Sequence, residues 1–255
     1  MKYMGGKYFL AKPISELLKS KVPPDKVDGY LEPFCGALNV LMKMNDEYPC
    51  EASDYHPDLI QMWSEVQGDK FIPPEQVSEE YYNESKKLES PSALKGFIGF
   101  GLSFSGKFYC GYAEKYRNEK KEDYLQEAKN SLKKIKPKIK DVKFKCISYD
   151  KLKPKNKLIY CDPPYQKTKF PIKYRTDTKH YDVFDNEKFW NVMREWSKTN
   201  YVFISETSSP PDFIPVWQKT THRSASQSEK TRYKNDSDAF KIEKVYVHES
   251  LKDLL

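Results

Sequence analysis

The sequence has little of what usually cross-links a small domain or binds a metal ion. It contains 5 cysteines and 4 histidines in 255 residues. The cysteine number is odd, no CxxC pair occurs, and the histidines lie far apart in the chain. The sequence therefore predicts neither a disulfide framework nor a metal site, and it favours a reduced compartment.

Long hydrophobic runs, internal repeats and low-complexity tracts are also lacking. No apolar run approaches the roughly 20 residues that a membrane-spanning helix needs, and nothing resembles a signal peptide. We therefore expect a cytoplasmic protein without a membrane partner. The hydrophobic content of 38% is sufficient for one large domain, or for a core domain with a smaller lobe.

Positive charge is what the sequence has in excess. Charged residues make up 32% of the chain, and the formal net charge is +7. This balance suits a partner rich in phosphate. Lysine-rich solvated surfaces are common in other proteins too, so the charge alone leaves both interpretations open.

The spacing of apolar residues predicts an α/β fold. The N-terminal part alternates between helical and strand-like patterns, and this alternation builds a parallel sheet. Helices are expected at 10–20, 56–66 and 186–198, the last with Asp185 as its N-cap, and strands at 28–34, 50–54, 141–148, 158–161, 201–206 and 239–249.

The pattern changes between the second and third strands. Residues 67–140 contain two helical segments around a stretch rich in glycine and aromatic residues, with no obvious strand. We therefore predict a sheet domain formed by 1–66 and 141–255, interrupted by an inserted helical lobe at 67–140.

The stretch "LIYCDPPY", 158–165, ends an apolar strand in an acid, two prolines and an aromatic ring. In a parallel sheet, ligands bind beyond the carboxyl ends of the strands. Pro163 and Pro164 lack a backbone N–H and hold φ at about −65°, so the chain leaves the sheet in a stiff, extended conformation. The Asp162 carboxylate and the Pro163 carbonyl are then two acceptors beside Tyr165, whose ring can stack on a planar group.

These groups fit an exocyclic amino group on an aromatic base. Its two N–H bonds can be donated to the two acceptors, which frees the nitrogen lone pair and stabilises the positive charge that develops when this nitrogen attacks. The alternative is structural: the prolines end the strand and Asp162 caps the next turn.

Three more segments contain residues that suit a cofactor site. Gly36 follows the first strand and permits close approach of a ligand to the backbone. Asp54 ends the second strand 18 residues later, a spacing at which an acid accepts hydrogen bonds from the ribose hydroxyls of an adenosine cofactor; its alternative role is to cap the next helix. In "KYMGGK", Lys7 offers a cation for a carboxylate, or is an ordinary solvated lysine.

The motifs "KYMGGK", "LEPFCG", "SDYHPDL" and "IYCDPPY" occur in this order. With "SFSGKFYCGYA", "VFISE" and "KIEKVYV", they make the chain similar to the Dam-type DNA adenine-N6 methyltransferases of the D12 class, especially the phage-like members. One departure is Leu38, where the family usually has a second glycine.

This resemblance implies a Rossmann-like methyltransferase sheet, mostly parallel with an antiparallel C-terminal strand, and an inserted DNA-recognition lobe. It implies a bacterial or phage-infected cell, S-adenosyl-L-methionine as methyl donor and S-adenosyl-L-homocysteine as product. The implied catalytic residues are Asp162, Pro163, Pro164 and Tyr165, and the implied cofactor-binding residues are Tyr3, Gly6, Lys7, Pro33, Phe34, Gly36, Asp54 and Asp162.

The expected substrate is double-stranded DNA. An adenine N6 inside a duplex is paired with its partner base, so the base must be flipped out to reach the predicted site. The inserted lobe occupies the place of the family's target-recognition region, and we expect DNA contacts from four of its residues, Lys107, Tyr109, Tyr112 and Arg117. We expect a monomer or a weak dimer.

Three alternatives differ in substrate or in activity. Cytosine N4 offers a similar amino group, although Asp before the two prolines favours adenine by resemblance. A catalytically idle DNA-binding homologue is disfavoured because Tyr3, Lys7, Asp54 and the DPPY residues are all intact. Methylation of a protein glutamine is disfavoured as well, because that reaction resembles the chemistry of an Asn-Pro-Pro-Tyr site.

Overall fold

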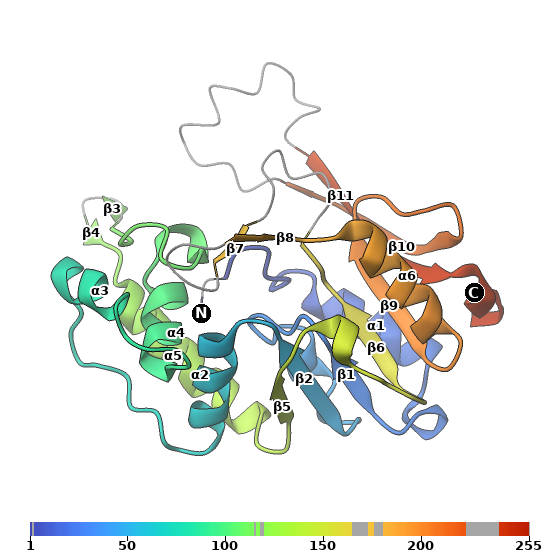
Figure 1. Cartoon of the computed structure of the whole chain (residues 1–255), viewed down its shortest axis with the longest axis horizontal. Helices are drawn as coiled ribbons and strands as arrows, with labels where there is room; N and C mark the ends of the chain where they lie inside the picture. Colours follow the sequence, from blue (N-terminus) through green and yellow to red (C-terminus); the bar gives the residue numbers. More distant parts are fainter. Residues whose placement is uncertain are drawn as a thin grey trace.

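The elements below come from a computed structural model, which describes residues 1, 3–114, 116–117, 120–164, 173–175, 181–222 and 240–254 (Figure 1). The helices are α1 (Ala11–Lys21), α2 (Pro57–Gln67), α3 (Glu79–Ser85), α4 (Ala93–Gly101), α5 (Tyr124–Ile135) and α6 (Asn186–Ser197). The strands are β1 (Tyr30–Glu32), β2 (Cys50–Asp54), β3 (Tyr116–Arg117), β4 (Lys120–Lys121), β5 (Lys143–Cys146), β6 (Leu158–Cys161), β7 (Lys173–Arg175), β8 (Tyr181–Val183), β9 (Tyr201–Glu206), β10 (Phe213–His222) and β11 (Phe240–His248). Short 3-10 helices are η1 (Pro24–Lys26), η2 (Leu41–Lys43), η3 (Phe104–Gly106), η4 (Lys136–Lys138), η5 (Tyr149–Lys151) and η7 (Glu249–Leu254).

A seven-stranded sheet organises the chain, in the order β10-β11-β9-β6-β1-β2-β5. β5, β2, β1, β6 and β9 pair in parallel, and β11 is antiparallel to both β9 and β10. The fold is therefore the predicted Rossmann-like methyltransferase sheet, mostly parallel with an antiparallel C-terminal strand. The sequence did not reveal β10, because Pro215 lies inside it and the register shifts between Pro215 and Trp217, which disturbs the alternation of a regular strand.

Helices cover both faces of the sheet because its strand residues point alternately to each side. Tyr30, Leu158 and Tyr160 pack in the same cluster as residues of α1 and α2. Their neighbours along the strands, including Leu31 and Ile159, pack in a second cluster with α6. Asp185 caps α6 as predicted, accepting a hydrogen bond from the backbone N–H of Lys188 at 2.9 Å.

The segment between β2 and β5 is mainly helical, as predicted. It lies at the end of the sheet opposite β10 and β11 (Figure 1), and α4 packs closely on α2: a Cβ on Gly96 would stand 2.3 Å from the carbonyl oxygen of Asp58. We expected no strand in this segment. This was wrong, because β3 and β4 form a short antiparallel pair. The boundaries of the lobe at 67 and 140 remain a prediction.

Candidate active site

Three acidic residues lie at the carboxyl ends of adjacent parallel strands. Glu32 ends β1, Asp54 ends β2, and Asp162 follows the last residue of β6. Because β2, β1 and β6 are neighbours in the sheet, these residues share one edge, where α/β proteins bind their ligands. The sequence motifs far apart in the chain therefore converge on one site.

Asp162 is held by Lys7. The Lys7 ammonium donates hydrogen bonds to both carboxylate oxygens, at 2.6 and 2.8 Å, and to the backbone carbonyl of Gly5 at 3.2 Å. Lys7 is buried, while the Asp162 side chain keeps 18% of its surface exposed. The alternative of a solvated Lys7 is thereby wrong, and Asp162 remains open to a ligand on one side.

Asp54 is held by the backbone. Its carboxylate accepts hydrogen bonds from the N–H groups of His56, at 3.0 Å, and Gly36, at 3.3 Å. The N-cap residue of α2 is His56, and no side chain caps the helix, so the alternative role of Asp54 as the helix cap was wrong; its bond to the His56 N–H lies in the turn before the helix. Burial raises the pKa of Asp54 from 3.8 to about 6, although the N–H donors act in the opposite direction.

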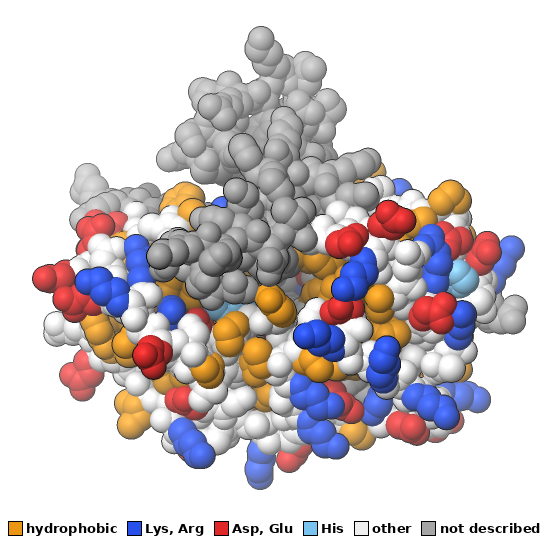
Figure 2. Space-filling model, viewed as in Figure 1, with side chains coloured by type: hydrophobic (Ala, Val, Ile, Leu, Met, Phe, Trp, Pro, Cys, Tyr) orange, Lys and Arg blue, Asp and Glu red, His pale blue; other side chains and the backbone are white. Residues whose placement is uncertain are grey.

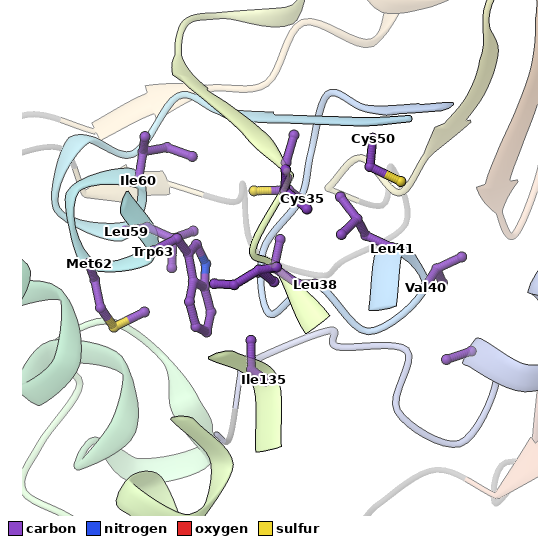
Figure 3. Close-up of a cluster of buried hydrophobic side chains, with 14 of the residues drawn as sticks. Cys35, Leu38, Val40, Leu41, Cys50, Leu59, Ile60, Met62, Trp63 and Ile135 are labelled. Carbon is purple, nitrogen blue, oxygen red and sulfur yellow. The ribbon is translucent and has the colours of Figure 1, made fainter. Parts of the chain in front are cut away.

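A tight turn carries Gly36 toward Asp54. Gly36 has φ +44° and Leu38 has φ +60°, and the Leu38 N–H donates to the carbonyl of Cys35 at 2.8 Å. The indole N–H of Trp63 donates to the Gly36 carbonyl at 2.9 Å. Leu38 lies beside Trp63 in the buried cluster (Figure 3), so a buried side chain and an indole hydrogen bond fix a turn for which the family usually uses a glycine.

Tyr3 covers this turn. A Cβ on Gly36 would stand 2.9 Å from the Tyr3 ring, and the ring itself packs against Phe100 of α4 at a centroid distance of 5.0 Å. Gly6 is exposed and its N–H donates to the Tyr3 carbonyl at 3.0 Å. The N-terminal motif thus joins the edge of the sheet to the lobe.

Pro33 and Phe34 differ in their surroundings from the other predicted cofactor residues. Pro33 is buried, and the half-buried Phe34 ring packs with Tyr149 at 5.1 Å and Phe189 at 5.8 Å, on the face covered by α6.

Of the predicted catalytic residues that follow Asp162, Pro163 is buried and Pro164 is half-buried. Tyr165 lies outside the described residues.

Glu32 is an acidic residue of this edge that the sequence analysis did not single out. It is buried, accepts a hydrogen bond from the hydroxyl of Tyr30 at 2.6 Å, and has its pKa raised to about 8, chiefly by burial and in part by the negative charge of Asp162. The signal was present in "YLEPF": a charged residue in an apolar strand.

Two polar side chains close to Asp54 in the sequence have buried atoms for which the described residues offer no hydrogen-bond partner: the hydroxyl of Ser53 and both ring nitrogens of His56. Burial lowers the pKa of His56 to about 4, so the ring is neutral near pH 7. Its ring packs edge-on against Phe100 and Phe108.

The four lobe residues predicted to contact DNA have different environments. Lys107 is exposed. Tyr109 is buried, its hydroxyl is hydrogen-bonded to Ser85 at 2.7 Å and its ring packs on Tyr82, so direct DNA contact by Tyr109 is not supported. The Tyr112 hydroxyl donates to a backbone carbonyl, that of Val77, at 2.8 Å, which favours a structural role.

Arg117 lies in β3, and its side chain is not among the described parts of the structure.

A surface hollow of about 870 Å³ lies beside α6 and is lined by Asp150, Lys155 and Trp196 among others. It contains none of the predicted site residues. The candidate site is therefore defined by the chemistry of the strand ends and not by the size of a hollow.

The sheet topology and the acids at its carboxyl edge define a methyltransferase of the Rossmann-like class. A family model described as D12 class N6 adenine-specific DNA methyltransferase matches residues 3–100 and 97–250. The chain belongs to this family: it is an adenine-specific DNA methyltransferase, its methyl donor is S-adenosyl-L-methionine, and its substrate is DNA.

Two other comparisons add little to this. No curated protein matches the sequence significantly. Among solved structures, the chain is similar to the rRNA methyltransferase aviRa from Streptomyces viridochromogenes, with 11% identity, a TM-score of 0.43, and coverage of 99% of this chain and 88% of that chain.

In the described part of the chain, no helix has the length and apolar character to cross a bilayer, and no cluster of His, Cys, Asp and Glu has the make-up of a metal site.

The residues at the edge fit an S-adenosyl-L-methionine molecule by their chemistry. A buried carboxylate suits two ribose hydroxyls, and a lysine ammonium suits the carboxylate of the amino-acid part. The predicted cofactor is thus consistent with the side chains that the fold brings together.

Proposed function

We propose that the chain methylates N6 of an adenine that is flipped out of double-stranded DNA, at the edge that carries Asp162. The observation that supports this most directly is the position of Asp162, 18% exposed beyond the end of β6, next to Lys7 and on the same edge as Asp54.

Asp54 binds the ribose hydroxyls of the cofactor, and Lys7 binds its carboxylate. Tyr3, Gly6, Pro33, Phe34 and Gly36 complete the binding surface. Asp54 is suited to this because the N–H groups of Gly36 and His56 already hold the carboxylate in place, so little further ordering is required on binding. The cofactor supplies a methyl group that its sulfonium activates, and the chain aligns the acceptor nitrogen with it.

Asp162 and the Pro163 carbonyl accept hydrogen bonds from the two amino protons of the adenine, and Tyr165 stacks on its ring. The negative charge of Asp162 stabilises the positive charge that develops on N6 during attack, and the surplus proton on the methylated nitrogen then leaves to water. The two prolines hold these acceptors in one backbone conformation.

Lys7 connects the two halves of the site. Its ammonium contacts both Asp162 oxygens, and the adenine amino group requires one of these oxygens beside the Pro163 carbonyl. We infer that Lys7 turns toward the cofactor carboxylate when the cofactor binds, so that at least one Asp162 oxygen becomes available to the base. This exchange favours binding of the cofactor before extrusion of the adenine.

A labelling experiment tests the proposed function. The protein is incubated with S-adenosyl-L-methionine labelled in its methyl group and with plasmid DNA, and the DNA is digested to nucleosides. Label in N6-methyldeoxyadenosine is expected. Label in N4-methyldeoxycytidine would move the substrate to cytosine, and absence of label in DNA despite cofactor binding would contradict the proposal.

A further inference from the structure

Exposed hydrophobic side chains gather around the N-terminal motif. Among the described residues, eight large hydrophobic side chains are exposed. Three of them, Met4, Tyr8 and Phe9, lie within six residues of chain around Lys7, and Tyr8 and Phe9 are 73% and 87% exposed. Soluble proteins rarely keep such a group of side chains in water without a binding role.

Tyr8 and Phe9 form a pair beside the catalytic acid. Their rings meet edge to face with centroids 5.3 Å apart. Lys7, the preceding residue, contacts Asp162 at 2.6 Å. Since consecutive Cα atoms are about 3.8 Å apart, the Phe9 backbone lies within about 8 Å of that of Lys7, the residue that contacts Asp162, and we infer that the pair belongs to the rim of the site.

The same rim continues onto the lobe. The Met4 N–H donates to the carbonyl of Gly106 at 3.2 Å, which places Met4 next to the turn η3. This turn carries Phe104, which is 55% exposed, and is followed by the exposed Lys107. On the face of the molecule drawn in Figure 2, hydrophobic, basic and acidic side chains are interspersed. Aromatic rings mixed with cations at the mouth of a site are typical of nucleic-acid contacts.

We propose that Tyr8 and Phe9 pack against the bases of duplex DNA next to the extruded adenine and so stabilise the extruded state. This inference rests on the proposed function. Extruding a base breaks its stacking with both neighbours, which costs a few kcal/mol, and an apolar ring placed against the exposed neighbours recovers part of that loss. A second copy of the chain is a poorer occupant, because a dimer that covered this rim would block access of DNA to Asp162.

The test uses a fluorescein-labelled duplex that contains a methylation site mapped on plasmid DNA. Affinity is measured by fluorescence anisotropy with S-adenosyl-L-homocysteine present, for the wild type, for the double variant Tyr8→Ala/Phe9→Ala and for Phe9→Trp. Ile72→Ala is the matched control, because Ile72 is 86% exposed but belongs to another part of the surface. A second duplex has the target adenine in a mismatch, which lowers the cost of extrusion.

We expect the double variant to bind the paired duplex about 10-fold more weakly, and the mismatched duplex with a clearly smaller loss. Phe9→Trp keeps most of the affinity, Ile72→Ala stays within about twofold of the wild type, and cofactor binding by calorimetry is unchanged in all variants.

Three results would overturn the inference: affinity of the double variant equal to that of Ile72→Ala, equal losses on both duplexes, or a wild-type dimer in sedimentation that the double variant abolishes without a change in DNA affinity. If the wild type transfers no label to any DNA, the proposed function itself fails. Transfer by the wild type together with an unaffected double variant refutes only the role of Tyr8 and Phe9.

Discussion

Asp54 and Asp162 occupy equivalent places at the ends of two parallel strands, yet the chain holds them in different ways. Asp54 is fixed by backbone N–H groups of Gly36 and His56, whereas Asp162 is held by the side chain of Lys7. The two N–H groups can move away from Asp54 only if the backbone of the turn changes conformation, whereas the Lys7 side chain can rotate and bind another partner. In the proposed function, this difference gives a permanently held acid for the cofactor at one strand end and an acid whose partner can change at the other.

Loss of Asp162 should have the largest effect. In Asp162→Ala, we expect kcat to fall by about 10³-fold or more, because the group that stabilises the charge on N6 is removed, while DNA affinity stays within a few-fold. Asp212→Ala is the matched control: Asp212 is 25% exposed and contacts Arg194 at 2.5 Å, but it precedes β10, at the opposite edge of the sheet. Single-turnover transfer of labelled methyl groups measures the effect, and normal turnover by Asp162→Ala would remove Asp162 from catalysis.

Removal of the switching lysine should act on the cofactor. In Lys7→Met, we expect affinity for S-adenosyl-L-homocysteine to fall by about 10- to 100-fold, as for a charge-assisted hydrogen bond. Affinity for 5′-methylthioadenosine, which lacks the carboxylate, should change much less. Isothermal titration calorimetry with both ligands separates the two cases. Equal losses for both ligands would mean that Lys7 only supports the fold, and Lys188→Met controls for removal of an ammonium elsewhere.

The backbone-held acid should give a pH dependence. At pH 8 Asp54 is ionised, and at pH 5 it is mostly protonated, because burial raises its pKa to about 6. We expect cofactor affinity of the wild type to fall as the pH drops through about 6, since charge-assisted bonds from the ribose hydroxyls require the carboxylate. Asp54→Asn should bind about 10-fold more weakly at pH 8 and show a flat profile between pH 5 and 7.

Protonation of Asp54 does not unfold the protein at low pH, so unfolding through this residue cannot explain a loss of cofactor affinity. An acid whose pKa is higher in the folded chain than its ordinary value of 3.8 contributes stability that increases as the pH falls. Parallel denaturation curves at pH 5 and 7 therefore separate cofactor affinity from folding. A pH-independent wild type would contradict the role of Asp54.

The sequence predicted the sheet better than the lobe, for a physical reason. Asp54 and Asp162 follow short apolar strands, and parallel pairing alone brings such strand ends to one edge. The roles of Tyr109 and Tyr112 depend on packing between helices, so composition suggested DNA contact where the fold buries one ring and ties both hydroxyls to neighbouring groups. The Lys7–Asp162 pair, 155 residues apart, was also beyond prediction from spacing.

The smallest expected effect concerns the turn that presents Gly36 to Asp54. Leu38 has φ +60°, a conformation that costs an L-residue about 1 kcal/mol, and its side chain is fully buried. Both Leu38→Ala and Leu38→Gly should lose stability because they leave a cavity beside Trp63. Glycine normally destabilises by roughly 0.5–1 kcal/mol relative to alanine, but at this φ the order should reverse by about 1 kcal/mol.

Urea denaturation of the two variants measures this reversal. Since both lack the leucine side chain, their difference reports the backbone conformation and not the packing. If Leu38→Ala is the more stable of the two, the turn relaxes out of the left-handed conformation, and the backbone clamp on Asp54 is then no more rigid than the lysine that holds Asp162.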